Sequence, residues 1–381
     1  MNPISCRACF CVVTLALASL YVVPCVAEEA AATVSSAESQ VKGLIDSGRY
    51  QAAFQAMEKE KAFDSTELPP RLLRAQALLG IGKYKDVSSV LTENDGPQAL
   101  GLLAQSAEAE GELDRALQLM TRAVDEKRKS LTSTETVEGA SALAESLTTL
   151  GEIALRAGQL DLAKTQFQQA VSLVNRAHAK LHELGIPHDE ADPRMFATGA
   201  TAGLARIFTA KGENPRAERT WRGVAGRSDD PVALVGLASH VLARNDVKTA
   251  KRHLDRALRL TEGKPNHRRI RALILADRGD TAEALTLARA AFADGPNLHA
   301  SDTLAWVLHK QGKHDEAGQT INQALASGTK DPLILCHAGL IAYAQGEKGL
   351  AKDRLTQALQ NHPVFDPLLV LEARRVLDQL R

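Results

Sequence analysis

The chain has 381 residues, which is enough for two or three ordinary domains or for one long repeat array. Its 46 Lys and Arg residues balance its 46 Asp and Glu residues, and the lack of a basic excess argues against nucleic acid as a partner. Aromatic residues make up only 4% of the sequence while Ala and Leu are abundant, which disfavours a sheet core and favours helices.

Residues 1–27 differ from the rest of the chain and have the pattern of a secretory signal peptide. One basic residue, Arg7, precedes an apolar run, and small residues lead up to Ala27 just before the acidic Glu28. Cleavage after Ala27 would give an exported protein, and we expect it in the periplasm or elsewhere in the cell envelope. Residues 28–36 are expected to form a linker.

An uncleaved segment 10–26 that anchors the chain in a membrane is the alternative, although this run is short for a span and is interrupted by Pro24. Lipidation at Cys25 is a third reading, which the neighbouring proline disfavours. Four of the five cysteines lie in residues 1–27, so cleavage would leave only Cys336 and no internal disulfide.

From residue 37 onward one pattern recurs. A small residue is followed after seven positions by Gly or Asn, after twelve usually by Ala, and after sixteen usually by a large apolar residue. The Ala positions from Ala217 to Ala351 lie 33 or 34 residues apart, whereas the two spacings on either side of Ala163 are 47 and 54. The Gly or Asn positions are Gly48, Gly82, Gly111, Gly158, Gly212, Asn245, Gly279, Gly312 and Gly346.

This spacing predicts helical hairpins. Gly adopts the left-handed turn that ends the first helix, and Asn tolerates this turn better than other residues. The small residues let two helices approach closely, and the large residue fills the space between hairpins. A single hairpin cannot bury its apolar face, so the hairpins are expected to stack into a solenoid.

Three stretches then show a family resemblance: Leu147–Ala170, Gly279–Pro296 and Gly346–Pro363. Over residues 37 to 364 the chain resembles the tetratricopeptide repeat (TPR) family. The resemblance implies an all-α, right-handed superhelical solenoid of about nine hairpins. The amphipathic residues 365–381 are expected to form the C-terminal capping helix that shields the last apolar face.

The two long spacings suggest a division of the array. Residues 37–130 are expected to form a subarray of three degenerate repeats, and residues 194–364 a subarray of repeats 5–9. Between them, residues 131–193 would form an extended repeat 4, whose second helix continues to Gly185, and a joint loop.

No catalytic constellation is evident. The segment Gly80–Lys83 lacks the upstream Gly and the following Ser or Thr of a phosphate loop. His182 and the acidic and histidine residues of 188–192 lack metal-ligand spacing, and Cys336 has no evident base partner. We therefore expect no enzyme, no cofactor and no metal site.

The TPR resemblance implies that the first helix of each repeat lines a concave groove. The candidate partner-binding residues at such positions are Arg206, Ser239, Arg269, Asp302, Trp306, His309 and Tyr343. Trp306 and Tyr343 are candidate anchors, since aromatic side chains with a polar tip are favoured at interfaces. Packing within the repeat is the alternative role for Trp306.

The sequence thus predicts a noncatalytic scaffold that binds a protein or peptide partner in its groove. Arg206 and Arg269 favour an acidic or extended partner, and the absence of their Asn companions argues against the chaperone-tail clamp found in some TPR proteins. A membrane-tethered assembly factor and a regulatory subunit of an envelope enzyme complex are the alternatives. Self-association is left open by the degenerate first repeat.

Overall fold

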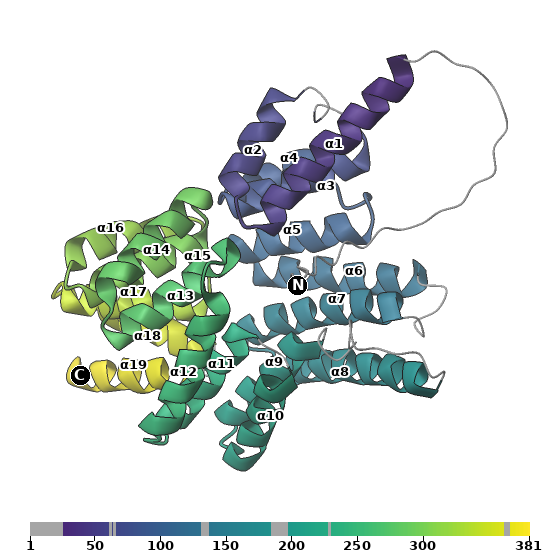
Figure 1. Ribbon diagram of the computed structural model, residues 1–381. Helices are drawn as coiled ribbons and strands as arrows, with labels where there is room; N and C mark the ends of the chain where they lie inside the picture. Colours follow the sequence, from purple (N-terminus) through teal and green to yellow (C-terminus); the bar gives the residue numbers. More distant parts are fainter. Residues whose placement is uncertain are drawn as a thin grey trace, which may run out of the picture.

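A computed structural model describes residues 26–60, 63, 66–130, 137–183, 197–227, 230–361 and 366–381 (Figure 1). These residues form nineteen α-helices and contain no strand. The α-helices are α1 (Val26–Asp46), α2 (Tyr50–Lys59), α3 (Leu68–Gly80), α4 (Val87–Val90), α5 (Pro97–Ala109), α6 (Leu113–Ser130), α7 (Val137–Arg156), α8 (Leu160–Glu183), α9 (Thr198–Ala210), α10 (Asn214–Arg227), α11 (Pro231–Leu242), α12 (Val247–Thr261), α13 (Arg268–Arg278), α14 (Thr281–Asp294), α15 (Leu298–Lys310), α16 (His314–Leu325), α17 (Pro332–Ala344), α18 (Lys348–Asn361) and α19 (Pro367–Gln379).

The helices pair in chain order into nine hairpins, from α1–α2 to α17–α18. Only the second hairpin departs from two full helices, because its second arm is a 3₁₀ turn, η2 (Tyr84–Asp86), followed by the short α4. Helix α19 packs on both arms of the last hairpin. The predicted all-α solenoid of stacked hairpins with a terminal helix is therefore confirmed.

The turn residues take the backbone conformation that the spacing predicted. All nine have a positive φ, and Asn245, at 62°, is the one residue other than Gly that does so among the described residues. At Gly279, with φ 91°, the N–H of Asp280 donates to the carbonyl of Leu275 at 2.9 Å. This bond occupies a carbonyl that the end of α13 would otherwise leave without a partner.

Small residues allow the close approach of neighbouring hairpins, as Phe167 illustrates. This side chain is fully buried between α7 and α9. A Cβ atom on Gly151 would lie 2.5 Å from the ring of Phe167, and a Cβ atom on Gly203 would lie 2.4 Å from it. The missing methyl groups of two adjacent hairpins therefore make the space that one large side chain fills.

The N-terminal part departs from the expected linker. Residues 28–36 belong to α1, because this Ala- and Glu-rich stretch favours a helix. Helix α8 has 24 residues, which agrees with the long second helix expected in repeat 4. Residues 1–25, with most of the predicted signal peptide, and residues 188–192 lie outside the described residues. Among the described helices, none has both the length and the apolar composition needed to cross a bilayer.

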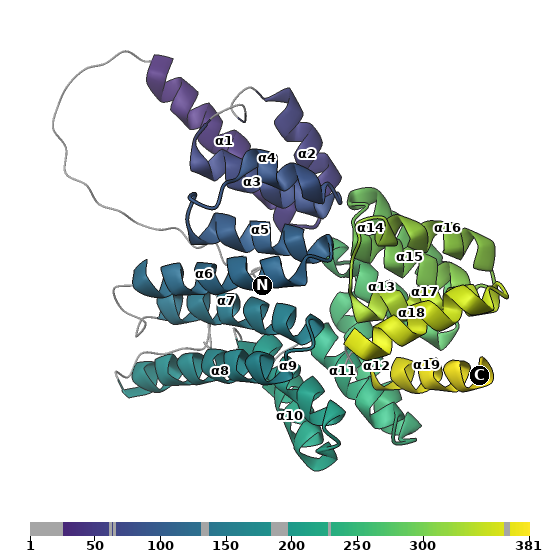
Figure 2. The ribbon, with the colours of Figure 1, turned by 180° about the vertical axis from the view of Figure 1, so that it is seen from behind.

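The array bends back on itself. Helices α1–α8 stack on one side of the molecule and α13–α19 on the other, with α9–α12 joining them (Figure 1). Seen from behind, the loops that flank α14 and α15 again face α3 and α5 (Figure 2). The division into subarrays 37–130, 131–193 and 194–364 remains a prediction. The bend brings α2 next to α14, and the turn after α3 next to the loop between α14 and α15.

Candidate functional site

The bend places the α14–α15 loop against the turn that follows α3. Asn297 donates a hydrogen bond from Nδ2 to the carbonyl of Gly80 at 3.0 Å. The backbone N–H of Leu298 donates to the hydroxyl oxygen of Tyr84 at 2.8 Å. Asn297 is also the N-cap of α15, because its Oδ1 accepts from the N–H of His299 at 3.1 Å. One asparagine thus starts a helix and fixes that helix to a distant repeat.

A second contact joins the α5–α6 turn to the α16–α17 loop, where two backbones approach each other. A Cβ atom on Gly111 would lie 2.1 Å from the carbonyl oxygen of Gly328, and a Cβ atom on Gly328 would lie 2.8 Å from that of Glu110. Only glycine fits at such distances. We call the two contacts together the closing contact.

An apolar cluster supports the closing contact. Tyr84 and Ala109 of the first half are buried together with Leu298, Leu308 and Ile334 of the second half. Burial raises the pKa of Tyr84 to about 12, although the hydrogen bond from Leu298 opposes this rise. The tyrosine therefore stays protonated at neutral pH, and its hydroxyl is both an acceptor and a donor.

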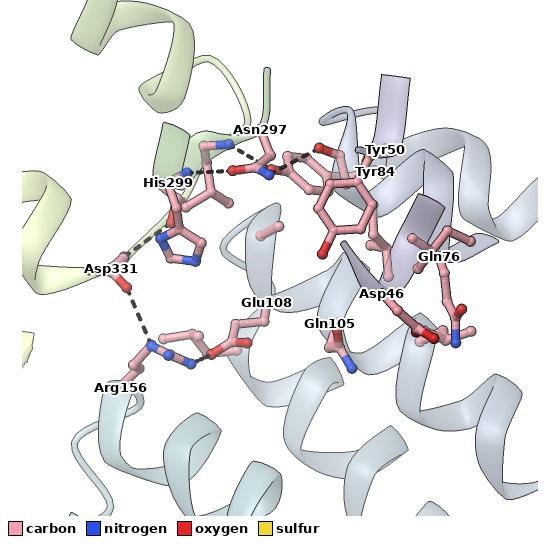
Figure 3. A pocket seen from close by; sticks show the side chains of 18 residues that line it. Asp46, Tyr50, Gln76, Tyr84, Gln105, Glu108, Arg156, Asn297, His299 and Asp331 are labelled. Atoms are coloured by element: carbon pink, nitrogen blue, oxygen red, sulfur yellow. Dashed lines mark hydrogen bonds and ion pairs between the residues drawn. The ribbon is translucent and has the colours of Figure 1, made fainter. Parts of the chain in front are cut away.

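A cavity of about 590 Å³ lies beside the closing contact (Figure 3). Leu79, Leu102 and Leu113 form part of its apolar wall. Its polar lining comes from both halves of the array and consists of Asp46, Tyr50, Gln76, Tyr84, Gln105, Glu108, Arg156, Asn297, His299, Thr329 and Asp331. We call this cavity the interior pocket.

Arg156, at the end of α7, holds two carboxylates in the interior pocket. Its Nη1 contacts Oε1 of Glu108, and its Nε lies 3.3 Å from Oδ2 of Asp331 (Figure 3). Burial lowers the pKa of Arg156, but these carboxylates outweigh burial and raise it. Burial raises the pKa of Glu108 in spite of Arg156, whereas for Asp331 the arginine and helix N–H groups outweigh burial and lower the pKa. One guanidinium is thus shared by two carboxylates.

His299 presents its imidazole to the interior pocket from the first turn of α15 (Figure 3). Burial and the nearby Arg269 lower its pKa to about 4. The ring is therefore neutral at pH 7, with one nitrogen that donates and one that accepts. It adds a hydrogen-bonding group without adding charge.

Arg269 lies close to the interior pocket, in the first turn of α13. Its side chain is exposed to solvent, yet enough protein surrounds it that desolvation lowers its pKa, against the opposing charges of Asp302 and Asp331. It forms no hydrogen bond or ion pair with any described residue. Its five N–H donors are thus free for a ligand.

The other predicted site residues have partners within the chain. Arg206 contacts Glu152, and Ser239 donates a hydrogen bond to the carboxylate of Asp366. The remaining contacts are Asp302 with His337 at 2.8 Å, His309 stacked on Trp306, and Tyr343 with Gln379 at 2.8 Å. Of the seven residues, Arg269 is the one with a charged group not satisfied inside the described structure.

Trp306 does not offer a free face for a partner. It is 3% exposed, and its ring stacks on His337 with 4.1 Å between ring centroids. Its Nε1 donates to Asp277 at 3.2 Å, and the ammonium group of Lys310 lies 4.7 Å from the ring centroid. The buried ring therefore has no free face for the predicted anchor role. It packs on residues of the neighbouring hairpins, which also differs from the alternative of packing within its own repeat.

The polar residues of the interior pocket were not among the predicted site residues. They come from repeats far apart in sequence, several of them from helix ends and turns, whereas the prediction takes positions beside the small residues of each first helix. Asn297 and Asp331 carried a visible signal, since each precedes a helix and caps it. That signal indicates a helix start and does not reveal a shared pocket.

Models of the tetratricopeptide repeat match this sequence at residues 144–173, 235–299 and 271–332. Among solved structures, a tetratricopeptide repeat protein from Parabacteroides merdae is similar at 18% identity and a TM-score of 0.37, over 74% of this chain and 98% of that one. Yeast Tom70 is similar at 13% identity and a TM-score of 0.36, over 91% and 88% of the two chains. A human IFIT1 dimer with m7Gppp-AAAA is similar at 17% identity and a TM-score of 0.41, over 78% and 67%. A comparison with curated protein sequences gave no match.

Proposed function

Because this chain is a tetratricopeptide repeat protein, we propose that it is a noncatalytic scaffold that holds a segment of a partner protein at the interior pocket. The TPR fold is suited to protein interaction. The free guanidinium of Arg269 beside the pocket is the observation that carries the proposal.

The chemistry of the pocket favours binding over catalysis. Glu108 and Asp331 are engaged by Arg156, and the neutral His299 offers hydrogen bonds. Exposed Gln105 and half-buried Gln76 add amide groups that can pair with a peptide backbone. An extended segment with a carboxylate positioned for Arg269 satisfies these groups together.

We place the protein in the cell envelope. The apolar run after Arg7 and the small residues before Glu28 support export. N-terminal sequencing of the protein from its native source tests this location. A first residue at Glu28 is the expected result, whereas an intact N-terminus would favour the anchor at 10–26.

Photo-crosslinking tests the pocket. A photoreactive phenylalanine analogue replaces Gln105, which is exposed in the pocket, or Gln357, which is exposed on α18. Crosslinked peptides are identified by mass spectrometry. We expect partner peptides from position 105 and a loss of these peptides when Arg269→Glu is added. Equal crosslinking from both positions, or an unchanged yield with Arg269→Glu, would overturn the proposal.

A further inference from the structure

The balanced charge of the whole chain conceals a strong local imbalance. Residues 211–278 hold 16 of the 46 Lys and Arg residues but only 8 of the 46 Asp and Glu residues, a net charge of +8. The rest of the chain carries the opposite excess. This segment contains α10, the whole hairpin α11–α12 and α13.

The basic side chains share helix faces. On α12, Lys248, Lys251, Arg252 and Arg259 are exposed and follow a spacing of three, four or seven residues, which places them on one side of the helix. On α10, the exposed Arg219 and Arg222 are three residues apart. We call these six residues the basic surface.

One hydrogen bond and the charges around His253 show that the basic side chains of α10 and α12 lie near one another. Arg256 of α12 donates from Nη1 to the carbonyl of Ala225 in α10 at 2.9 Å. Burial lowers the pKa of His253, and the charges of Arg252 and Arg256 on its own helix and of Arg222 on α10 lower it further. Positive charges from both helices therefore act on the same side chain, His253.

Acidic residues nearby compensate only part of this charge. The carboxylate of Asp246 is close enough to Arg222 and Arg252 for their charges to lower its pKa, after hydrogen bonds from Thr249. Glu218 contacts two guanidinium groups, those of Arg222 at 2.5 Å and of Arg244, and so leaves one positive charge in excess. Arg252 donates to the hydroxyl of Thr249 at 3.0 Å. The remaining members, Arg219, Lys248, Lys251 and Arg259, form no ion pair with a described residue.

A large partner is expected to bind an outer surface of the molecule, because the concave side is partly filled. The closing contact fills part of the concave side with the chain's own loops, so the interior pocket admits a segment rather than a folded body. In both views α10 and α12 lie at the lower edge, away from that contact (Figures 1 and 2). Apolar anchors are scarce there, and Val247 is the one large apolar side chain of α12 that is exposed, at 65%.

We propose that the basic surface docks an acidic segment of a partner protein, rich in Asp and Glu. The choice of a protein rests on the proposed scaffold function, and the choice of an acidic segment rests on charge complementarity. Because the surface lacks a cluster of apolar anchors, binding depends on charge and weakens with salt.

The test uses the full chain and two labelled peptides. One peptide has eight Glu-Ser repeats, the other has eight Gln-Ser repeats, and fluorescence anisotropy follows binding at low and physiological salt. We expect the Glu peptide to bind and to lose affinity with salt. The triple variant Lys248→Glu, Lys251→Glu, Arg252→Glu should lower this affinity by about tenfold or more. The matched control reverses three exposed charges elsewhere, Lys348→Glu, Lys352→Glu and Arg374→Glu, and should change it by less than about twofold.

Circular dichroism confirms that both triple variants remain helical. Equal binding of the two peptides, an equal loss in both variants, or tighter binding to anionic phospholipid vesicles or to a single-stranded oligonucleotide would each overturn the proposal. Arg269→Glu serves as the separate control for the interior pocket. Crosslinking at position 105 that persists in Arg269→Glu, together with salt-sensitive binding of the Glu peptide, would overturn the interior pocket and leave the basic surface standing. Loss of this crosslinking with no binding of the Glu peptide would do the reverse.

Discussion

The hydroxyl oxygen of Tyr84 accepts a hydrogen bond from the backbone N–H of Leu298 at 2.8 Å, across 214 residues of chain. Leu298 is the first residue of α15, and its N–H has no carbonyl partner within the helix. A side chain of the second repeat thus supplies the hydrogen-bond acceptor that the first N–H of the eighth repeat lacks.

Removal of this hydroxyl tests the closing contact. Tyr84→Phe leaves the buried N–H of Leu298 without its acceptor and should lower the free energy of unfolding by about 1–2 kcal/mol. Urea denaturation measures the loss. Tyr343→Phe is the control, because the hydroxyl of Tyr343 bonds Gln379 at an exposed position and its removal should cost about 0.5 kcal/mol or less. Equal losses would contradict a special role for Tyr84.

Two turn glycines with nearly the same φ allow the cost of backbone strain to be measured apart from the cost of disturbing the closing contact. Gly111 has φ 78° and Gly312 has φ 77°, but only at Gly111 would a Cβ atom meet another loop. Gly312→Ala should cost about 1 kcal/mol from strain alone. Gly111→Ala should cost more, and it should enlarge the radius of gyration measured by small-angle X-ray scattering, since its methyl group pushes Gly328 away. An unchanged radius would show that the closing contact tolerates a methyl group.

The charges in the interior pocket make Arg156 a sensitive position. Arg156→Gln leaves Glu108 and Asp331 close together without their shared cation, and should lower the free energy of unfolding by about 2–4 kcal/mol. Lys211→Gln is the control, since its partner Asp161 is 96% exposed at 3.6 Å, and should cost less than about 0.5 kcal/mol. Adding Glu108→Gln to Arg156→Gln should restore part of the loss. If the double variant is no more stable than Arg156→Gln, the loss of stability does not come from the unpaired carboxylates.

Acid should weaken the fold through His299. The folded state lowers the pKa of this histidine from 6.5 to about 4, so folding favours the neutral ring. The resulting stabilisation is complete above pH 6.5 and is lost as the pH falls toward 4, with a slope of at most about 1.4 kcal/mol per pH unit. His309 has a similarly lowered pKa of about 4 and adds to the effect. His299→Gln should reduce the difference in urea midpoint between about pH 7 and pH 5, and an unchanged difference would assign the acid sensitivity to other groups.

The hairpins could be predicted from the sequence because each depends on nearby residues. The left-handed turn at Asn245 and the pocket for Phe167 between Gly151 and Gly203 follow from local spacing. The bend could not be predicted in this way. Asn297 reads as an N-cap whether or not its Nδ2 reaches Gly80, and the pair is separated by 217 positions. The position of Arg269 on a first helix predicts a partner-binding residue. That its guanidinium has no hydrogen bond or ion pair with a described residue can be seen only in the folded structure.

The junction between early and late hairpins also affects how the protein folds. In an open repeat array each unit gains stability only from its immediate neighbours, so the ends fray first and truncation is tolerated. A bond from Asn297 to Gly80 makes the stability of one terminal region depend on the other. Such long-range pairing raises contact order, slows folding and favours a single cooperative transition over stepwise melting.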